Sequence, residues 1–316
     1  MVSVVPESLG VNVPVDTTIT VVFSEKIDEI TLEKALWVTP GGAVKPRIKV
    51  SGREATIRLG RAFPETTTVG VLITTVLMDR KRAGQQNRMT RSYRWIFSTG
   101  DAVWPGLVHG KVERVGGAVG QGQLLVALYP GDADTVPDAL TTDPLAITEA
   151  DTSGRYELVG VPADGERRWL FGLFDRDGNR EIRGPGEFAS AEPESVTLTA
   201  ELPEAVIPLR LVDPNAPGSI QGTLVRAEGD TASIWLELHA AADSLAQPAK
   251  RTKASRDGSF AFRQVPPGTY RLIAFCDQDE SGRQDPEEIW QGFGLVEVRP
   301  GETHELGDWV GPRCVP

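Results

Sequence analysis

The stretch Gly268-Thr-Tyr-Arg-Leu-Ile-Ala-Phe-Cys-Asp277 decides the fold class of this 316-residue chain. Polar and apolar residues alternate along most of it, and it is rich in β-branched and aromatic side chains, which is the pattern of a β-strand. A second strand-like run, Gly292-Phe-Gly-Leu-Val-Glu-Val298, follows it. Neither run has the periodicity of an amphipathic helix. The sequence therefore predicts two β-strands joined by the acidic segment between them.

That acidic segment, Asp277-Gln-Asp-Glu-Ser-Gly-Arg-Gln-Asp-Pro-Glu-Glu288, has the spacing of a calcium-binding loop of the EF-hand type. Oxygen-bearing side chains occupy its first, third, fifth, ninth and twelfth places, and a glycine occupies the sixth. A hard cation takes about six to eight oxygen ligands. The predicted Ca²⁺ ligands are Asp277, Asp279, Ser281, the backbone carbonyl of Arg283, Asp285 and Glu288. The alternative is a solvated acidic turn without metal, because turns select the same residue types.

Four sequence blocks recur in the same order in the middle and last parts of the chain, which indicates an internal duplication. The pairs are Gly106–Val112 with Gly218–Leu224, Leu124–Tyr129 with Ile234–His239, Asp151–Pro162 with Ser255–Pro266, and Trp169–Asp177 with Tyr270–Asp279. The last pair extends into a second acidic loop. Its candidate ligands are Asp175, Asp177, Asn179, Glu181 and Glu187. Arg180 stands where the glycine is expected, and Glu187 comes one residue late, so this second metal site is expected to be weaker.

Short proline-bearing linkers at Trp104-Pro-Gly106 and Asp213–Pro217 divide the chain into three segments. The predicted domains are residues 1–101, 106–213 and 218–312. The first holds several short alternating runs and one short helix near Thr31–Leu36, for which Thr31 or Asp28 is the N-cap. We therefore predict an all-β protein with three β-sandwich domains in an elongated row.

Composition narrows the class of partners. The chain has 33 Lys and Arg against 44 Asp and Glu, a formal net charge of −11, and no basic cluster, which argues against nucleic acid as a partner. No run approaches the roughly 18 apolar residues that would span a bilayer. The two cysteines, Cys276 and Cys314, are interpreted as free buried thiols in preference to a disulfide, because the sequence does not supply the Cα separation that decides pairing.

The first segment resembles the bacterial Ig-like domain of surface-layer and envelope proteins, on the strength of Val5–Pro14, Asp16–Glu25 and Trp95–Asp101. The two repeats are similar to carboxypeptidase-regulatory-like (prealbumin-like) β-sandwiches, through an Asp/Ser-x-x-Gly-x-aromatic strand, a Val-Pro turn and an aromatic strand leading into Asp-x-Asp. Proteins of this order look like exported envelope lipoproteins. The resemblance implies an extracytoplasmic location, with an export signal and a lipid-bearing cysteine expected upstream of Met1.

Enzymatic chemistry finds little support in the sequence. His109, His239 and His304 are scattered, without the spacing of a metal-binding or triad motif. The glycine-rich stretch Gly116–Gly122 is followed by no helix and is interpreted as a hairpin turn rather than a phosphate-binding loop. We expect no catalytic residues and no organic cofactor.

Two tryptophans outside the strand-like runs, Trp104 in the first linker and Trp290 after the acidic loop, are candidates for contacts with protein partners. The alternative is that they pack against neighbouring domains. We predict a non-catalytic structural and interaction protein, an extrinsic scaffold subunit that bridges proteins at a membrane or cell surface and is stiffened by calcium. The alternative function is a carbohydrate- or ligand-binding module of a secreted hydrolase system.

Overall fold

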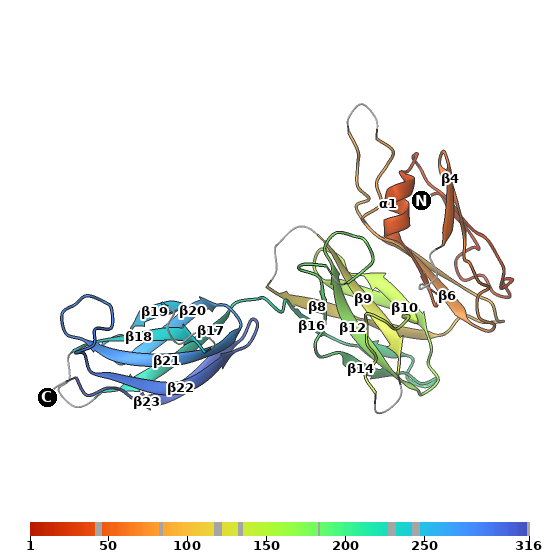
Figure 1. Ribbon diagram of the computed structural model, residues 1–316. Coiled ribbons are helices and arrows are strands. Elements are labelled where there is room, and N and C mark those ends of the chain that lie inside the picture. Colours follow the sequence, from red (N-terminus) through yellow and green to blue (C-terminus); the bar gives the residue numbers. More distant parts are fainter. Residues whose placement is uncertain are drawn as a thin grey trace. The chain divides into compact units, whose positions relative to one another are not determined.

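The computed structural model describes residues 1–41, 46–81, 85–116, 122–131, 135–182, 184–226, 232–241 and 247–314. Apart from one short helix, the regular secondary structure of the described residues consists of β-strands, which confirms the all-β prediction (Figure 1). The chain divides into an N-terminal unit, Met1–Arg114 with Ala118–Leu211, and a C-terminal unit, Val115–Gly117 with Val212–Pro316. The predicted glycine-rich turn falls largely on residues 117–121, which lie outside the described residues.

The first segment is a sandwich of two antiparallel sheets. One has the order β1-β2-β5-β4 and the other β3-β6-β7. Their bounds are β1 Ser3–Val5, β2 Ile19–Val22, β3 Leu36–Thr39, β4 Arg47–Ser51, β5 Glu54–Arg58, β6 Thr68–Ile73 and β7 Tyr93–Ser98. Inward-facing residues such as Ile19, Ile57 and Phe97 form a buried core between the sheets.

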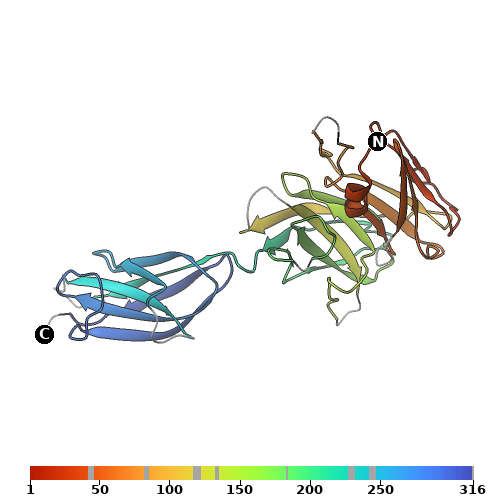
Figure 2. The same ribbon diagram turned by 45° about the horizontal axis from the view of Figure 1, so that its top comes forward.

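The helix of the first segment, α1, spans Glu29–Ala35 and lies beside β4 and β6 (Figure 2). Asp28 is its N-cap, because the Asp28 carboxylate accepts a hydrogen bond from the Thr31 backbone N–H at 2.9 Å. Thr31, the other predicted cap, lies inside the helix and donates its hydroxyl to the Asp28 carbonyl at 3.1 Å.

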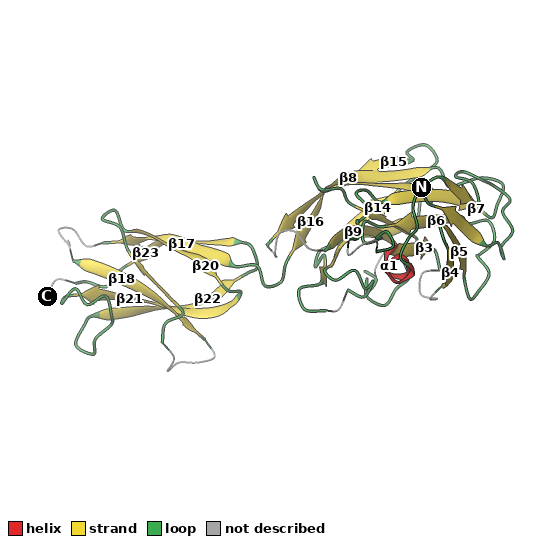
Figure 3. Cartoon of the chain, turned by 90° about the horizontal axis from the view of Figure 1, so that it is seen from above, coloured by secondary structure: helices red, strands yellow, loops and turns green. Residues whose placement is uncertain are grey.

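The two predicted repeats have the same strand order, which supports the duplication. In the first repeat the sheets are β10-β9-β12, with β13 and β14 also paired to β12, and β11-β8-β15, with β16 also paired to β8. In the second they are β19-β18-β21-β22 and β20-β17-β23, two layers that Figure 3 shows from above. In both repeats the first strand pairs in parallel with a strand from the end of the repeat.

The strand bounds of the repeats are as follows. The first repeat has β8 Gly106–Val115, β9 Gln123–Pro130, β10 Ala146–Glu149, β11 Arg155–Val161, β12 Arg167–Asp175, β13 Phe188–Ala189, β14 Glu194–Thr197, β15 Glu204–Val206 and β16 Leu209–Val212. The second has β17 Gly218–Val225, β18 Ser233–Ala240, β19 Lys250–Lys253, β20 Ser259–Val265, β21 Gly268–Asp277, β22 Trp290–Val298 and β23 Thr303–Val310.

The first two segments pack against each other inside the N-terminal unit. Leu72 of β6 belongs to the same apolar cluster as Leu125 of β9 and Phe171 of β12. Arg94 of β7 crosses this joint, donating from Nε to the Ile147 carbonyl at 3.1 Å and from Nη1 to the Val159 carbonyl at 2.8 Å. Loss of hydration lowers the pKa of Arg94 to about 10, although the negative charge of Glu157 acts to raise it. Because these two segments share one compact unit, their division into independent domains stays a prediction.

Cys276 and Cys314 form a disulfide, so the preferred interpretation of two free thiols was wrong. The C-terminal residues return to β21 and bring the two Cα atoms to 5.5 Å, within the range that a disulfide requires. The separation depends on the tertiary fold of the whole repeat, which the local sequence does not specify.

A glycine in each Asp/Ser-x-x-Gly-x-aromatic turn lets the chain enter its strand. Gly258 has a φ of +84°, and a Cβ there would lie 2.0 Å from the Leu224 carbonyl oxygen. Gly154 has a φ of +82° and a similar approach, 2.5 Å, to the Val112 carbonyl oxygen. These contacts belong to the ladders β17–β20 and β8–β11, whose backbone hydrogen bonds include Leu224 N–H to the Gly258 carbonyl at 2.9 Å.

We predict that Gly258→Ala destabilises the C-terminal unit by about 2 to 4 kcal/mol, because it adds a steric clash to an unfavourable backbone conformation. Gly294→Ala is the matched control, since Gly294 has a φ of +82° and open space around it. That control isolates the backbone cost, about 1 to 2 kcal/mol. Urea unfolding of both variants measures the difference, and equal destabilisation by the two would contradict the clash.

Candidate functional site

The acidic loop Asp277–Glu288 begins on the last residue of β21 and ends just before β22, as the sequence predicts. It brings carboxylate oxygens of Asp277, Asp279 and Glu288 within 4.8 Å of one another. Asp277 and Glu288 are 5% and 8% exposed, whereas Asp279 lies at the surface. The cluster therefore sits at the end of the sandwich with one side open to solvent.

Backbone N–H groups of the loop hold these carboxylates in place. Asp277 accepts from the Gly282 N–H at 3.2 Å, and Asp279 accepts from the Ser281 N–H at 2.9 Å. Glu288 closes the loop by accepting from the Gln278 N–H at 2.9 Å and from the Asp285 N–H at 3.0 Å. The three acids are thus oriented by the loop itself.

The loop Asp175–Glu187, which starts on the last residue of β12, repeats this arrangement in the N-terminal unit. Carboxylate oxygens of Asp175, Asp177 and Glu187 lie within 4.8 Å of one another. Asp175 accepts from the Arg180 N–H at 3.0 Å, and Asp177 accepts from the Asn179 N–H at 2.9 Å. In both loops, therefore, the first acid accepts from the N–H of the sixth residue, and the third accepts from the N–H of the fifth.

The closing acid is also bound in the same way in both loops. Glu187 accepts from the Arg176 N–H at 3.2 Å and from the Gly184 N–H at 2.6 Å. The fifth place accepts from the N–H of the seventh in both loops: Asn179 Oδ1 from Glu181 at 2.6 Å, and Ser281 Oγ from Arg283 at 3.2 Å. The two loops therefore share one hydrogen-bonded frame.

Arg180 does not distort the loop, although the spacing pattern of a calcium-binding loop has a glycine at its place. Its φ is +71°, and that of its counterpart Gly282 is +67°. At the fourth place the types are exchanged, with Gly178 at +70° and Glu280 at +60°. At the fourth and sixth places, each loop thus has two left-handed residues, of which one is a glycine. A non-glycine residue in this conformation costs of order 1–3 kcal/mol and persists where surrounding contacts fix it.

Several predicted ligands lie outside the three-carboxylate clusters. The contacts of Asp285 and Glu181 inside the loops come from their backbone N–H groups, which donate to Glu288 and Asn179. Ser281 donates its hydroxyl to the Arg283 carbonyl at 3.1 Å, and Asn179 donates its side-chain amide to Asp177 at 3.1 Å. Their role as ion ligands stays a prediction.

Electrostatics make each cluster suited to a cation. Burial raises the pKa of Asp175, and the charges of Glu187 and Asp177 raise it further, while N–H bonds from Arg180 and Gly178 oppose the shift. In the exposed part of the other loop, bonds from Ser281 lower the pKa of Asp279. The donor set is all oxygen, which fits a hard divalent ion such as Ca²⁺. An ion bound by these residues would neutralise carboxylates that otherwise repel one another, and it would stiffen the loop.

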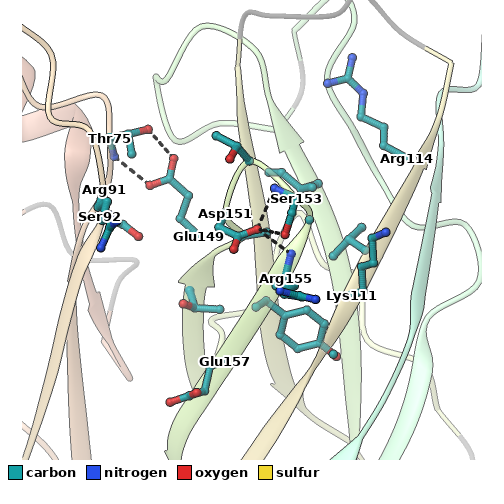
Figure 4. Close-up of a pocket in the computed structure, with 18 of the residues that line it drawn as sticks. Thr75, Arg91, Ser92, Lys111, Arg114, Glu149, Asp151, Ser153, Arg155 and Glu157 are labelled. Atoms are coloured by element: carbon teal, nitrogen blue, oxygen red, sulfur yellow. Dashed lines mark hydrogen bonds between the residues drawn. The ribbon is translucent and has the colours of Figure 1, made fainter.

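A polar cleft of about 1220 Å³ forms a second candidate site in the N-terminal unit (Figure 4). Lys111 of β8 and Arg155 of β11, directly opposite each other in their ladder, line one side, and Arg91 lines the other. Glu149 is bound by the Thr75 N–H at 2.8 Å and by the Thr75 hydroxyl at 2.5 Å. Burial raises the pKa of Glu149, and the Thr75 bonds oppose that shift.

Two acids of the cleft, Glu149 and Asp151, are held by hydrogen bonds from neighbouring residues. Asp151 accepts from the Ser153 hydroxyl at 2.7 Å and from the Arg155 N–H at 2.9 Å, and these contacts lower its pKa. His109 is paired with Glu204 at 2.9 Å.

The sequence of the first segment also has a family match. Residues 1–99 match the model of the bacterial Ig-like domain. This confirms the resemblance of the first segment, and we call it the Ig-like domain below. Among curated protein sequences, none matches the chain.

Several solved structures are similar to the chain. The Bacillus anthracis TIE protein is 12% identical over 99% of this chain, with a TM-score of 0.27, and the chain spans 58% of that protein. GBS52, the minor pilin of Streptococcus agalactiae, is 15% identical over 67% of this chain and 97% of its own, with a TM-score of 0.22. A putative cell adhesion protein from Bacteroides ovatus is 12% identical over 65% of this chain and 92% of its own, with a TM-score of 0.28. Likenesses this distant carry no argument about function.

Sequence reasoning missed the residues that join the Ig-like domain to the first repeat. Arg94 and the pair Glu149–Thr75 bridge the two, as does Arg180, whose guanidinium lies 5.0 Å from the Trp37 ring of the Ig-like domain. No local pattern marks these residues. Polar residues within apolar strand-like runs, such as Arg94 between Tyr93 and Trp95, are the nearest signal in the sequence.

Proposed function

We propose that the protein is a non-catalytic, extracytoplasmic structural and interaction protein whose β-sandwiches are stiffened by calcium in the acidic loops. The observation that carries this proposal is the hydrogen-bonded frame shared by loops Asp175–Glu187 and Asp277–Glu288. The same three-acid arrangement follows the equivalent strand in each repeat, β12 or β21, which favours a common ligand over two unrelated surface turns. A divalent ion fits it because carboxylates held this close repel one another when no cation is bound.

Two observations support the extracytoplasmic location. The Ig-like match is to a bacterial family, and a disulfide joins Cys276 to Cys314. Disulfides persist mainly in oxidising compartments such as the periplasm and the cell surface. Within the described residues, no helix is long and apolar enough to cross a membrane. A lipid anchor upstream of Met1 remains part of the proposal.

The proposed contact with protein partners involves the edge strand β22. Its first residue, Trp290, is 56% exposed; Ile289 just before it is 40% exposed, and Leu295 further along the strand is 65% exposed. Large aromatic side chains are frequent at the centres of protein interfaces. Trp104 is half-buried, so its proposed contact is the smaller of the two; its backbone N–H donates to the Thr68 hydroxyl at 2.6 Å.

We predict that Trp290→Ala reduces recovery of the native membrane assembly with this protein by about ten-fold or more, the effect of losing an interface residue worth at least 1.4 kcal/mol. The measurement is quantitative cross-linking and purification from membranes that carry the tagged protein. Leu202→Ala is the control, because Leu202 is 72% exposed and lies in the N-terminal unit. Both variants should melt as the unmodified protein does. Unchanged recovery with Trp290→Ala would remove β22 as the contact.

The second candidate function is a ligand-binding module, favoured by the polar cleft lined by Arg91, Lys111 and Arg155. It is distinguished by titrating the protein with neutral and acidic oligosaccharides and following the resonances of the His109 ring at the cleft wall. Saturable shifts that Arg155→Ala abolishes would favour this module. Turnover of a glycan, peptide or ester that one carboxylate change abolishes would overturn the non-catalytic proposal altogether.

A further inference from the structure

The acidic loop Asp175–Glu187 contacts the Ig-like domain through Arg180. The Arg180 backbone N–H donates to Asp175 inside the loop. Its side chain leaves the loop, places its guanidinium 5.0 Å from the Trp37 ring, and donates from Nη1 to the Glu33 carbonyl at 3.3 Å. Trp37 is the second residue of β3 and is half-buried, and Glu33 belongs to α1. One residue therefore joins the carboxylate cluster to two elements of the neighbouring domain.

The joint beside this loop contains buried polar atoms that lack hydrogen-bond partners. Gln123 is 1% exposed, and among the described residues neither its Oε1 nor its Nε2 has a hydrogen-bond partner; the same is true of Arg180 Nε and Trp37 Nε1. Gln123 lies directly across the β9–β12 ladder from Asp175. A Cβ added at Gly178 of the loop would be 3.5 Å from Gln123 Nε2 and 2.8 Å from the Val76 side chain of the Ig-like domain. The carboxamide thus lies where loop and domain meet.

Buried polar groups without partners are costly, and in folded proteins they often mark the place of a bound ion or water. A hydrated divalent cation at Asp175, Asp177 and Glu187 would carry water molecules, and Gln123 is the buried polar side chain directly across the ladder from Asp175. Water-mediated bonds are nearly as favourable as direct ones. The orphaned carboxamide is therefore an indication of a ligand that is independent of the acidic cluster itself.

We propose that a divalent cation in loop Asp175–Glu187 locks the Ig-like domain onto the first repeat through Arg180. This inference rests on the proposed function, in which the loops bind calcium. The ion fixes the Asp175 carboxylate, which accepts the hydrogen bond from the Arg180 N–H. That bond in turn holds the left-handed backbone of Arg180, from which its guanidinium reaches Trp37 and Glu33. The loop Asp277–Glu288 has Gly282 at the same place, so that loop has no side chain there to reach a neighbour.

Thermodynamic linkage requires the coupling to act in both directions. If the ion stabilises the docked domain, then the docked domain raises the affinity of the loop for the ion by the same factor. Couplings between two sites are typically about 5- to 150-fold. Cutting the arginine contact should therefore weaken ion binding at this loop alone, while leaving its carboxylates in place.

The test combines calcium equilibrium dialysis with hydrogen exchange measured by mass spectrometry, in calcium and in chelator. In the unmodified protein, calcium should slow exchange about five-fold or more at residues 33–39 of the Ig-like domain as well as in the loop. Arg180→Gly and Arg180→Asn both tolerate the left-handed backbone. With either variant, calcium should still slow exchange in the loop, lose its effect at residues 33–39, and bind about five-fold more weakly.

Two double variants separate this inference from the proposed function. Asp175→Asn with Glu187→Gln should remove one bound calcium and the response at residues 33–39, whereas Asp277→Asn with Glu288→Gln should remove one calcium and leave that response intact. Calcium bound at Asp175–Glu187 without any response at residues 33–39 would overturn the lock and leave the calcium proposal standing. Dialysis that finds no calcium on either loop would overturn both. Melting curves of each variant verify folding, and the two Arg180 variants provide independent replicates.

Discussion

Saturating calcium should raise the melting temperature of the C-terminal unit by on the order of 10 °C relative to chelator. A ligand that binds only the folded state adds about 2.7 kcal/mol at 100 times its Kd, and one kcal/mol moves a unit of this size by several degrees. The physical source is relief of repulsion among Asp277, Asp279 and Glu288, which the folded loop holds within 4.8 Å. Differential scanning calorimetry measures the shift.

Glu288→Gln should abolish that shift, because it removes one charge from the cluster while keeping a side chain that can accept one of the two N–H bonds. Glu287→Gln is the matched control: it removes the same charge one residue earlier, at an exposed position outside the cluster. Identical melting of the unmodified protein in calcium and in excess chelator would rule out the loop as an ion site. Loss of the shift in both variants would show that only net charge matters.

Reduction of the disulfide should destabilise the C-terminal unit by roughly 3 to 4 kcal/mol, the loop-closure entropy for a crosslink across 38 residues. The bridge ties Cys314, near the end of the described chain, to Cys276 of β21, and both belong to the buried core of the unit. Without it, the segment after β23 loses its covalent attachment to β21. Urea unfolding with and without a reductant measures the change in the free energy of unfolding.

The N-terminal unit is an internal control for the disulfide prediction, because both cysteines of the chain lie in the C-terminal unit. Its unfolding transition should not move with reductant. Cys314→Ser should lower the stability of the C-terminal unit by a similar amount and become insensitive to reductant. Equal stability of oxidised and reduced protein would contradict the prediction.

Local patterns were sufficient to predict the fold class and the duplication. Alternating runs such as Gly268–Asp277 specify strands, and turn residues such as Gly258 specify where those strands begin. The positions of Asp277, Asp279 and Glu288 in the cluster were likewise predicted from spacing, because all three lie in one short loop. Strand identity and loop spacing are both properties of contiguous sequence.

The features that the sequence did not predict depend on residues far apart in the chain. The disulfide needs the C-terminal segment to return to β21, and Arg94 needs β10 and β11 of the next segment to offer their carbonyls. The left-handed backbone of Arg180 has a related cause, whereas the expectation that the second metal site is the weaker one stays a prediction. Contacts with Trp37 and Glu33 help to hold Arg180 in a backbone conformation that a short motif assigns to glycine.

The exchange of glycine between the fourth and sixth places has a consequence for how such loops diverge after a duplication. The frame needs two left-handed residues, but one glycine is enough, and it can stand at either place. The other place is then free to acquire a side chain, and in one copy that side chain is Arg180, which contacts Trp37 and Glu33. Searches that demand glycine at the sixth place will therefore pass over the copy that has taken on an additional role.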